Sequence, residues 1–487
     1  MRTRLRTLIL PALLALLPAV AGAAVRTVPD HADLTGPFAD GPAVTEACLG
    51  CHEDVAHDFM KTSHWTWQSS QTVVGKGETS VGKRNLVNNY AIAVPSNWPY
   101  CTSCHAGYGW NSASFDFTKA GNVDCLVCHD QTGKYRKFPT GAGHPPYKPT
   151  AWEGKIWEQQ DLASLARTVG KPSRANCGAC HFTADGGNNV KHGDLELALV
   201  APARELDVHM SADGQNFSCQ ECHTTSHHEI AGRAMFSSPG ASTNHLECTG
   251  CHDDSVHSKR ILNWHAKSLA CQACHIPAVA RENPTVVSWD WSTAGKNMAA
   301  TTDSLGKPVF DKTKGTLSWA KNVVPSYAWF DGVSVQYLLG DKMDPAVVTH
   351  LNRPQGSRLD PRAKIYPFKV TRGKQPYDKE QNILLVPQLY GPGGFVETND
   401  WDKAFKSGMS AAGLAFSGHH AFAETESWEK INHMVAPKEA ALKCADCHKG
   451  EAKGRIDWAA LGYKGDPSKT RGISRFDLKD AYGDLNR

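Results

Sequence analysis

The chain has 487 residues, a mean hydropathy of −0.41 and a formal net charge of +3. At this hydropathy we expect no segment beyond the N-terminus to reach the roughly 20 consecutive apolar residues of a membrane span. The near balance of 52 basic and 49 acidic residues leaves no basic excess for binding nucleic acid or an anionic membrane.

The N-terminus has the features of a secretory signal. Three early arginines precede an apolar run from Leu8 to Val20, and Ala21-Gly22-Ala23 offers a small-residue cleavage site. We therefore predict a signal peptide over residues 1–23 and a soluble, periplasmic mature chain, with an extracellular location as the alternative. Loss of the three arginines leaves 49 basic residues against 49 acidic ones.

All 16 cysteines fall in eight Cys-x-x-Cys-His motifs, numbered here in chain order. Two cysteines at this spacing bond covalently to one c-type haem, and the following histidine coordinates its iron. Disulfides would not require a histidine after every second cysteine, and zinc would need the motifs to pair around four-ligand sites. The sequence therefore predicts eight covalently attached c-type haems. Their attachment residues are Cys48, Cys51, His52; Cys101, Cys104, His105; Cys125, Cys128, His129; Cys177, Cys180, His181; Cys219, Cys222, His223; Cys248, Cys251, His252; Cys271, Cys274, His275; and Cys444, Cys447, His448.

So many haems leave little protein for each one. Cleavage near Ala23 leaves about 464 residues, or about 58 for each haem, far less than an ordinary domain. The motifs follow one another at irregular intervals, so equal solenoid repeats are excluded, and 42 glycines with 27 prolines predict many loops. We predict a multihaem cytochrome c fold that is mostly α, with short helices, abundant coil and few strands. Stacked haems are expected to replace a continuous hydrophobic core.

Residues 276–443 contain no haem motif. We interpret this stretch as a scaffold that wraps the haem cluster and closes a substrate cleft. The sequence of residues 425–448 predicts two helices that are divided before Pro437. A proline is well tolerated in the first turn of a helix, so the second helix would begin there. This segment would pack the last haem against the other seven, so residues 24–487 are predicted to form one domain. Three aromatic segments in the scaffold have strand-like or turn-like character: 289–296, 326–332 and 363–370.

The histidine count separates two kinds of multihaem protein. Beyond the eight motif histidines the chain has 15 others. A haem that only transfers electrons has a second strong axial ligand, usually histidine or methionine, whereas a haem that performs chemistry has a weakly held or open position. Seven distal histidines and one exception would indicate an enzyme, and eight would indicate an electron conduit.

Short runs spread along the chain resemble the octahaem tetrathionate reductase family of multihaem c-type cytochromes. The runs are TSHWTW, CTSCHAGYGW, VDCLVCHD, VKHGDL, DVHM, NFSCQECHTT, WDWSTAG, YAWFDG, AKIYPFKV, KINHMV and GYKGDP. They occur in order, and the resemblance extends along nearly all of the mature chain, including the motif-free stretch. The resemblance implies a soluble enzyme whose haems stack in parallel and perpendicular pairs, with a lysine ligand at the second haem. Tetrathionate, nitrite and hydroxylamine are the substrates it implies.

Carried onto this chain, the resemblance implies that the second haem is held by Cys101, Cys104 and His105, and that Lys191 is its lysine ligand. An amine binds iron only when deprotonated, and both burial and a nearby ferric ion lower the pKa of a lysine. A lysine that takes up a proton or swings away would expose the iron to substrate. His192 is then available to serve another haem or to form a hydrogen bond in the cleft.

The other histidines divide into two groups by position. Those in the wider stretches that resemble the family are candidates for seven distal positions, so at least one of the eight should have another role: His64, His192, His209, His228, His245, His257, His265 and His433. The remaining seven are interpreted as exposed or ordinary hydrogen-bonded residues: His31, His57, His144, His227, His350, His419 and His420.

The chain departs from the family pattern beside the proposed site. Asn188 stands where the family carries an aspartate, and Ala91 stands where it carries a cysteine. Loss of the carboxylate removes a candidate proton donor, so we expect proton-coupled reduction to depend on another group. Asn188 and His192 are therefore treated with Lys191 and His105 as candidate catalytic residues.

We predict that the protein reduces a small inorganic anion or hydroxylamine, with seven haems storing and delivering electrons. Lys134, Arg136 and Lys137 are candidates for attracting an anion, although the preferred interpretation of this basic run is a solvated loop. The haem propionates make the holoprotein acidic, so a basic patch on a partner cytochrome or quinol dehydrogenase would guide docking. The rival interpretations are a non-catalytic electron-transfer cytochrome and, ranked lower, an enzyme related to hydroxylamine oxidation.

Overall fold

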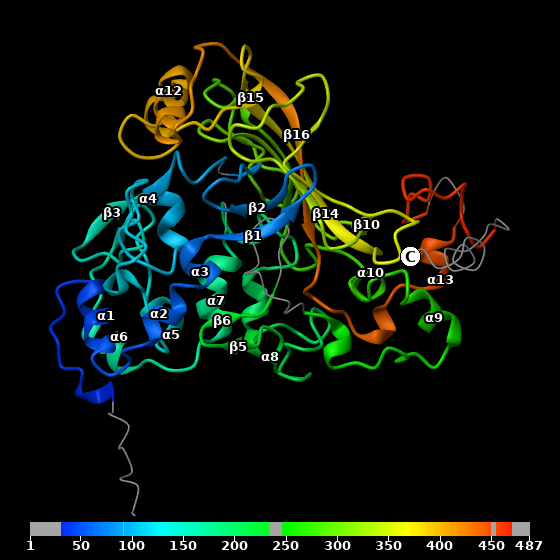
Figure 1. Ribbon diagram of the computed structural model, residues 1–487, viewed down its shortest axis with the longest axis horizontal. Coiled ribbons are helices and arrows are strands. Elements are labelled where there is room, and N and C mark those ends of the chain that lie inside the picture. The colour runs from blue at the N-terminus through cyan, green and yellow to red at the C-terminus, as the bar shows by residue number, and fades with distance from the viewer. Residues whose placement is uncertain (1–30, 91, 185, 233–245, 450–453, 470–487) are drawn as a thin grey trace, which may run out of the picture.

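Short helices gather around the haem motifs in this computed structural model, which describes residues 31–90, 92–184, 186–232, 246–449 and 454–469 (Figure 1). Residues three and four apart share one face of a helix, so a single turn brings the cysteines and the histidine of a motif to the same side. The α-helices are α1 Gly41–Leu49, α2 Val55–Phe59, α3 Ser63–Thr66, α4 Trp98–Cys101, α5 Leu126–His129, α6 Leu162–Arg167, α7 Arg174–His181, α8 Cys219–Cys222, α9 Arg260–His265, α10 Gln272–His275, α11 Phe395–Thr398, α12 Trp401–Ala411 and α13 Cys444–Cys447.

The predicted signal peptide, residues 1–23, lies outside the described residues. Across the ranges that the structure describes, none of the helices has the length and apolar character needed to cross a membrane.

A large sheet follows the seventh motif, so the prediction of few strands was wrong. Its main path has the order β12-β16-β14-β7-β9-β8, and β10 and β15 also pair with β14. These strands are β7 Thr285–Asp290, β8 Phe310–Asp311, β9 Gly315–Ala320, β10 Ser326–Phe330, β12 Thr349–His350, β14 Lys364–Asp378, β15 Ile383–Leu384 and β16 His420–Lys430.

Smaller sheets lie among the helices. The path β13-β11-β1-β2 forms one sheet, and β3 with β4 and β5 with β6 form two ribbons. Their strands are β1 Gln68–Val73, β2 Gly77–Gly82, β3 Thr150–Trp152, β4 Lys155–Trp157, β5 Thr225–Ser226, β6 Glu229–Ile230, β11 Ser334–Gln336 and β13 Asn352–Pro354. Because β11 and β13 come from the motif-free stretch and β1 and β2 come from the N-terminal part, this sheet joins the two regions.

Strand β16 occupies part of the segment for which helices were predicted. It runs antiparallel to β14 from the pair Phe368 and Lys430 to the pair Asp378 and His420. Buried residues alternate along it with a period of two, the period of a strand, but several of them are polar. Asn89 satisfies two of these: it accepts a 2.8 Å hydrogen bond from Thr425 and donates a 3.0 Å hydrogen bond to Ser427. A pattern of apolar residues alone could not reveal this strand.

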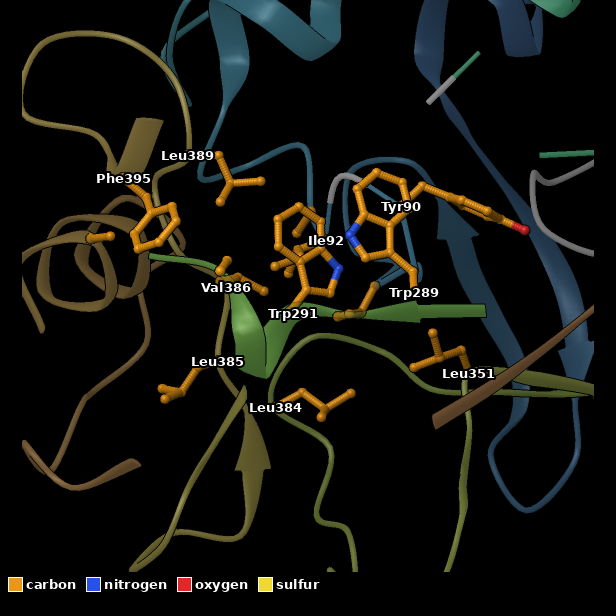
Figure 2. Close-up of a cluster of buried hydrophobic side chains, with 14 of the residues drawn as sticks. Tyr90, Ile92, Trp289, Trp291, Leu351, Leu384, Leu385, Val386, Leu389 and Phe395 are labelled. Atoms are coloured by element: carbon orange, nitrogen blue, oxygen red, sulfur yellow. The ribbon is translucent and has the colours of Figure 1, made fainter. Parts of the chain in front are cut away.

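The sheet has a conventional hydrophobic core, which corrects the prediction that haems replace one throughout. Figure 2 shows Tyr90, Trp289, Trp291 and Phe395 in this core, with leucines and valines from the strands and loops around them. The core also receives Phe405 from α12. In the helical region the buried apolar clusters of the described residues hold only three to six side chains each. The region around the large sheet thus has a larger apolar core than the helical region that carries the haem motifs.

Replacement of Phe405 by alanine is expected to lower the free energy of unfolding by about 3–5 kcal/mol, because it removes a fully buried ring from the sheet core. Guanidinium denaturation followed by far-ultraviolet circular dichroism measures this change. A loss below about 1 kcal/mol would show that α12 does not depend on this core contact.

Candidate functional site

Seven motif histidines each face a second histidine. Their ring centroids lie 6.1–6.3 Å apart. Two imidazole nitrogens that each bind one metal ion at about 2 Å place their ring centroids roughly 6 Å apart. The spacing therefore fits one iron between each pair, as a haem with two axial histidines requires. The pairs are His31–His52, His64–His181, His129–His228, His209–His252, His223–His433, His257–His275 and His265–His448.

Several of these rings are oriented by a hydrogen bond at Nδ1. Such a bond fixes the tautomer of a metal-binding histidine and directs its Nε2 toward the metal. The Nδ1 contacts are His129 to the Gly170 carbonyl at 2.8 Å, His223 to the Ala231 carbonyl at 2.8 Å, His257 to Asn263 at 3.2 Å, His433 to Asp194 at 3.2 Å and His448 to Asp466 at 2.7 Å. These seven pairs therefore fit seven of the haems that the motifs predict.

The second motif is different. Among the described residues no histidine stands opposite His105 at the separation of the other pairs. Its buried ring lies instead within five aromatic side chains, namely Trp65, Trp67, Trp110, Phe115 and Phe117. Its Nε2 lies 2.7 Å from the Trp65 carbonyl oxygen, whereas its Nδ1 is buried without a hydrogen-bond partner. Burial lowers the pKa of His105 to about 3, so the ring is held neutral.

Lys191 lies in the loop that follows the fourth motif, and only 8% of it is exposed. The fourth motif, from which this loop begins, adjoins the second motif, because Cys180 Sγ lies 3.9 Å from the Cys104 carbonyl oxygen. The Lys191 carbonyl oxygen accepts hydrogen bonds from the ammonium of Lys369 at 2.7 Å and from the hydroxyl of Tyr90 at 3.3 Å. The candidate lysine ligand is therefore anchored through its backbone.

The two neighbours of Lys191 singled out in the sequence have separate surroundings. Asn188 Oδ1 accepts a 2.8 Å hydrogen bond from the Leu197 amide, so its side chain holds the loop together. His192 faces no motif histidine in a ligand pair; its Nδ1 lies 3.6 Å from Glu429 Oε2. Burial, aided by the charge of Lys191, lowers the pKa of His192 well below its usual range. His192 is thus a polar group beside Lys191 and differs from the other candidate distal histidines.

The structure places the remaining candidates as follows. Six of the eight candidate distal histidines face a motif histidine, His192 does not, and His245 lies outside the described residues. His31, which the sequence indicated to be an ordinary surface residue, faces His52 instead. It lies in a short 3-10 turn with no motif or apolar periodicity, so no sequence signal distinguished it. Among the described residues, the other histidines of this group do not face a motif histidine; His227, for example, contacts Asp58 at 3.0 Å.

Cysteines of different motifs lie side by side. Thiol groups are within hydrogen-bonding reach in the pairs Cys48–Cys125, Cys104–Cys180, Cys177–Cys219 and Cys248–Cys271. These contacts bring together the first and third motifs, the second and fourth, the fourth and fifth, and the sixth and seventh. The second motif thereby adjoins the fourth, which is itself joined to the fifth.

A buried polar cluster connects the second and third motifs. The carboxylate of Asp124 accepts hydrogen bonds from Tyr108 at 2.7 Å and Tyr135 at 2.9 Å, and from the Val127 amide of the third motif at 3.1 Å. The ammonium of Lys137 lies 3.0 Å from the same carboxylate and donates to the His105 carbonyl oxygen. With only 7% of its side chain exposed, Lys137 is neither positioned to attract an anion from solution nor part of a solvated loop, so both interpretations from the sequence were wrong for this residue.

Replacement of Asp124 by asparagine is expected to lower the free energy of unfolding by about 3 kcal/mol, because it leaves the Lys137 charge buried without its counter-ion. Thermal unfolding followed by circular dichroism tests this expectation, with Asp116→Asn on an exposed loop as the matched control. Equal stability of the two variants would show that the ion pair is dispensable.

A cavity of about 210 Å³ lies at the start of the Lys191 loop. Asn188 and Val190 form one side of it, and Trp289 and Trp319 contribute aromatic surface. Lys307 and Lys314 add positive charge, although Asp311 lies 3.6 Å from Lys314 and offsets part of it. The cavity therefore offers a partly cationic approach to the loop.

Comparisons with known proteins agree with this geometry. A family described as bacterial cytochrome c matches residues 286–451. The crystal structure of an octahaem cytochrome c from Shewanella oneidensis is similar, with 49% sequence identity and a TM-score of 0.84 over 92% of this chain and 99% of that chain. An uncharacterised protein from Archaeoglobus fulgidus is 25% identical over 229 residues, covering 39% of this chain and 76% of the relative. The protein therefore belongs to the octahaem c-type cytochromes, and its Cys-x-x-Cys-His motifs carry covalently attached c-type haems.

Proposed function

We propose that this cytochrome is a periplasmic reductase that acts on tetrathionate, nitrite or hydroxylamine at the haem of the second motif. The observation that carries the proposal is the difference between His105 and the other seven motif histidines, each of which faces a second histidine. Two strong axial ligands suit electron transfer, whereas a weakly held position permits binding and reduction of a substrate. The second motif is therefore the candidate catalytic centre.

In this proposal the seven histidine pairs ligate seven haems, and His105 and Lys191 hold the eighth. When bound, that haem supplies a redox-active iron at which a substrate can accept electrons. Lys191 would hold that haem as a neutral amine, and after taking up a proton it could no longer bind iron. The released ammonium then places a positive charge beside an anionic substrate, which favours binding of tetrathionate or nitrite.

Other residues of the loop support this role in different ways. Lys307 and Lys314 in the neighbouring cavity would favour the approach of an anion. Asn188 lacks a titratable proton and its amide oxygen is already engaged, so we do not assign it the role of proton donor. His192 remains the candidate polar group beside Lys191.

Electrons would reach the second motif through the fourth, because the thiols of Cys104 and Cys180 are neighbours. The donor in this proposal is a cytochrome or quinol dehydrogenase with a basic docking patch. Haem propionates make the holoprotein acidic, so charge complementarity would speed the encounter between the two proteins.

A non-catalytic electron-transfer cytochrome is the second candidate function. The side-by-side placement of cysteines from different motifs favours it, since closely spaced haems form an efficient electron path. An electron-transfer cytochrome requires no substrate, and the haem of its second motif would have the same role as the other haems.

Stopped-flow reoxidation of the chemically reduced holoprotein distinguishes the two functions. Tetrathionate, nitrite and hydroxylamine are each mixed with the reduced protein, and the haem absorbance is followed. A reductase is expected to reoxidise at a rate that rises and then saturates with the concentration of at least one of them. Reoxidation no faster than in buffer for all three would favour the electron carrier.

A further inference from the structure

The loop that carries Lys191 is attached to the large sheet by one buried ammonium. Lys369 lies on β14 and is 1% exposed. Its Nζ donates hydrogen bonds to the carbonyl oxygens of Val190 at 2.8 Å and Lys191 at 2.7 Å, and to the hydroxyl oxygen of Thr285 at 2.6 Å. Three acceptors thus match the three N–H bonds of an ammonium group.

Thr285 extends the same attachment toward the start of the loop. Its hydroxyl oxygen lies 2.6 Å from the Asn189 carbonyl oxygen and 3.1 Å from that of Val190. Thr285 begins β7, which pairs with β14 in the large sheet, so both side chains project from one rigid element. Three consecutive carbonyl groups of the loop, from Asn189 to Lys191, are therefore held by the sheet.

The charges around Lys369 favour its buried ammonium form. Strand pairing places Glu429 of β16 directly across from Lys369, and both residues are buried. Asp194 adds a second negative charge nearby, whereas Lys191 itself opposes the charge on Lys369. These two carboxylates partly offset the unfavourable burial of the Lys369 ammonium group.

We propose that Lys369 is a positioning residue that fixes the backbone of Lys191 so that its amine reaches the second haem. This inference rests on the proposed function. With its backbone fixed at the carbonyl group, Lys191 can leave the iron only by motion of its own side chain, and the loop does not need to open. The anchor therefore sets how readily an external molecule replaces the amine.

The test compares folded holoproteins at pH 6 by two readouts. Electron paramagnetic resonance counts high-spin ferric haems, and stopped-flow mixing measures the rate of carbon monoxide binding to the reduced protein. Lys369→Met is expected to bind carbon monoxide at one haem about tenfold faster than wild type, because a charged hydrogen-bond donor to the loop is lost. A new high-spin signal from a fraction of one haem is also expected. Lys374→Met, on the same strand, is the matched control and should resemble wild type.

Lys191→Ala serves as the reference variant. If it leaves the spectra and the carbon monoxide rate unchanged, the proposed lysine ligation fails. If it creates a high-spin haem while Lys369→Met, with eight haems attached, behaves as wild type, only the positioning role is overturned.

A milder pair of variants decides the matter if Lys369→Met does not fold. Thr285→Val removes the hydroxyl group that accepts from Lys369 while keeping the shape of the side chain. It is expected to accelerate carbon monoxide binding about threefold. Thr285→Ser keeps the hydroxyl group and should match wild type. Equal rates for the two variants would overturn the proposal.

Discussion

Replacement of Lys191 by alanine is expected to convert one of the eight ferric haems to the high-spin state and leave the others unchanged. The reason is that the proposed amine ligand disappears, whereas seven histidine pairs stay in place. Carbon monoxide should bind one reduced haem at least about tenfold faster than in wild type, which corresponds to about 1.4 kcal/mol of activation free energy. Electron paramagnetic resonance and stopped-flow absorbance measure the two effects.

The same variant should reduce anionic substrates less efficiently although its iron is more accessible. The ammonium released from iron is proposed to stabilise a bound anion, and alanine cannot replace that charge. We expect the second-order rate constant for reoxidation by tetrathionate or nitrite to fall about tenfold. Lys374→Ala controls for loss of a lysine elsewhere on the protein. Faster reoxidation by both anions in Lys191→Ala would contradict this electrostatic role while leaving the ligand assignment intact.

Replacement of His433 by alanine is expected to convert a different haem, that of the fifth motif, to the high-spin state. His433 faces His223 with ring centroids 6.3 Å apart, and its Nδ1 is held by Asp194. Burial alone would raise the pKa of Asp194, but the hydrogen bond and charge of His433 lower it, so the two residues stabilise each other. Loss of His433 should therefore remove an axial ligand and also loosen the loop after Lys191.

His420→Ala is the matched control for His433→Ala. His420 lies on β16 and contacts Asp402 at 3.2 Å, and it faces no motif histidine in a ligand pair. We expect its replacement to leave all eight haem spectra unchanged. A high-spin signal in the control, or its absence in His433→Ala with all haems attached, would refute the pairing.

The haem attachment sites could be predicted from the sequence because their chemistry is local. Two cysteines and a histidine within five residues define each site without reference to the fold. The distal positions are different, since each joins residues far apart in the chain. His31 could not be recognised from the sequence, because only the folded chain brings its ring opposite that of His52. The resemblance to a known family, and not the spacing of the residues, singled out Lys191.

The fold was less predictable where buried residues are polar. Lys369, Asn89 and Glu429 are all buried in or against the sheet, and their burial depends on partners from distant segments. A search for apolar periodicity passes over such positions and misses the strands that carry them. Lys137 illustrates the same limit, because a lysine in a basic run resembled a surface charge until Asp124 was found beside it.

Near-infrared magnetic circular dichroism of the ferric wild-type holoprotein tests the central claim most directly, because it distinguishes haems with two histidine ligands from haems with one histidine and one amine. We predict seven haems of the first kind and one of the second, and loss of the second signal in Lys191→Ala. Eight haems with two histidine ligands would contradict the account and identify the protein as an electron conduit.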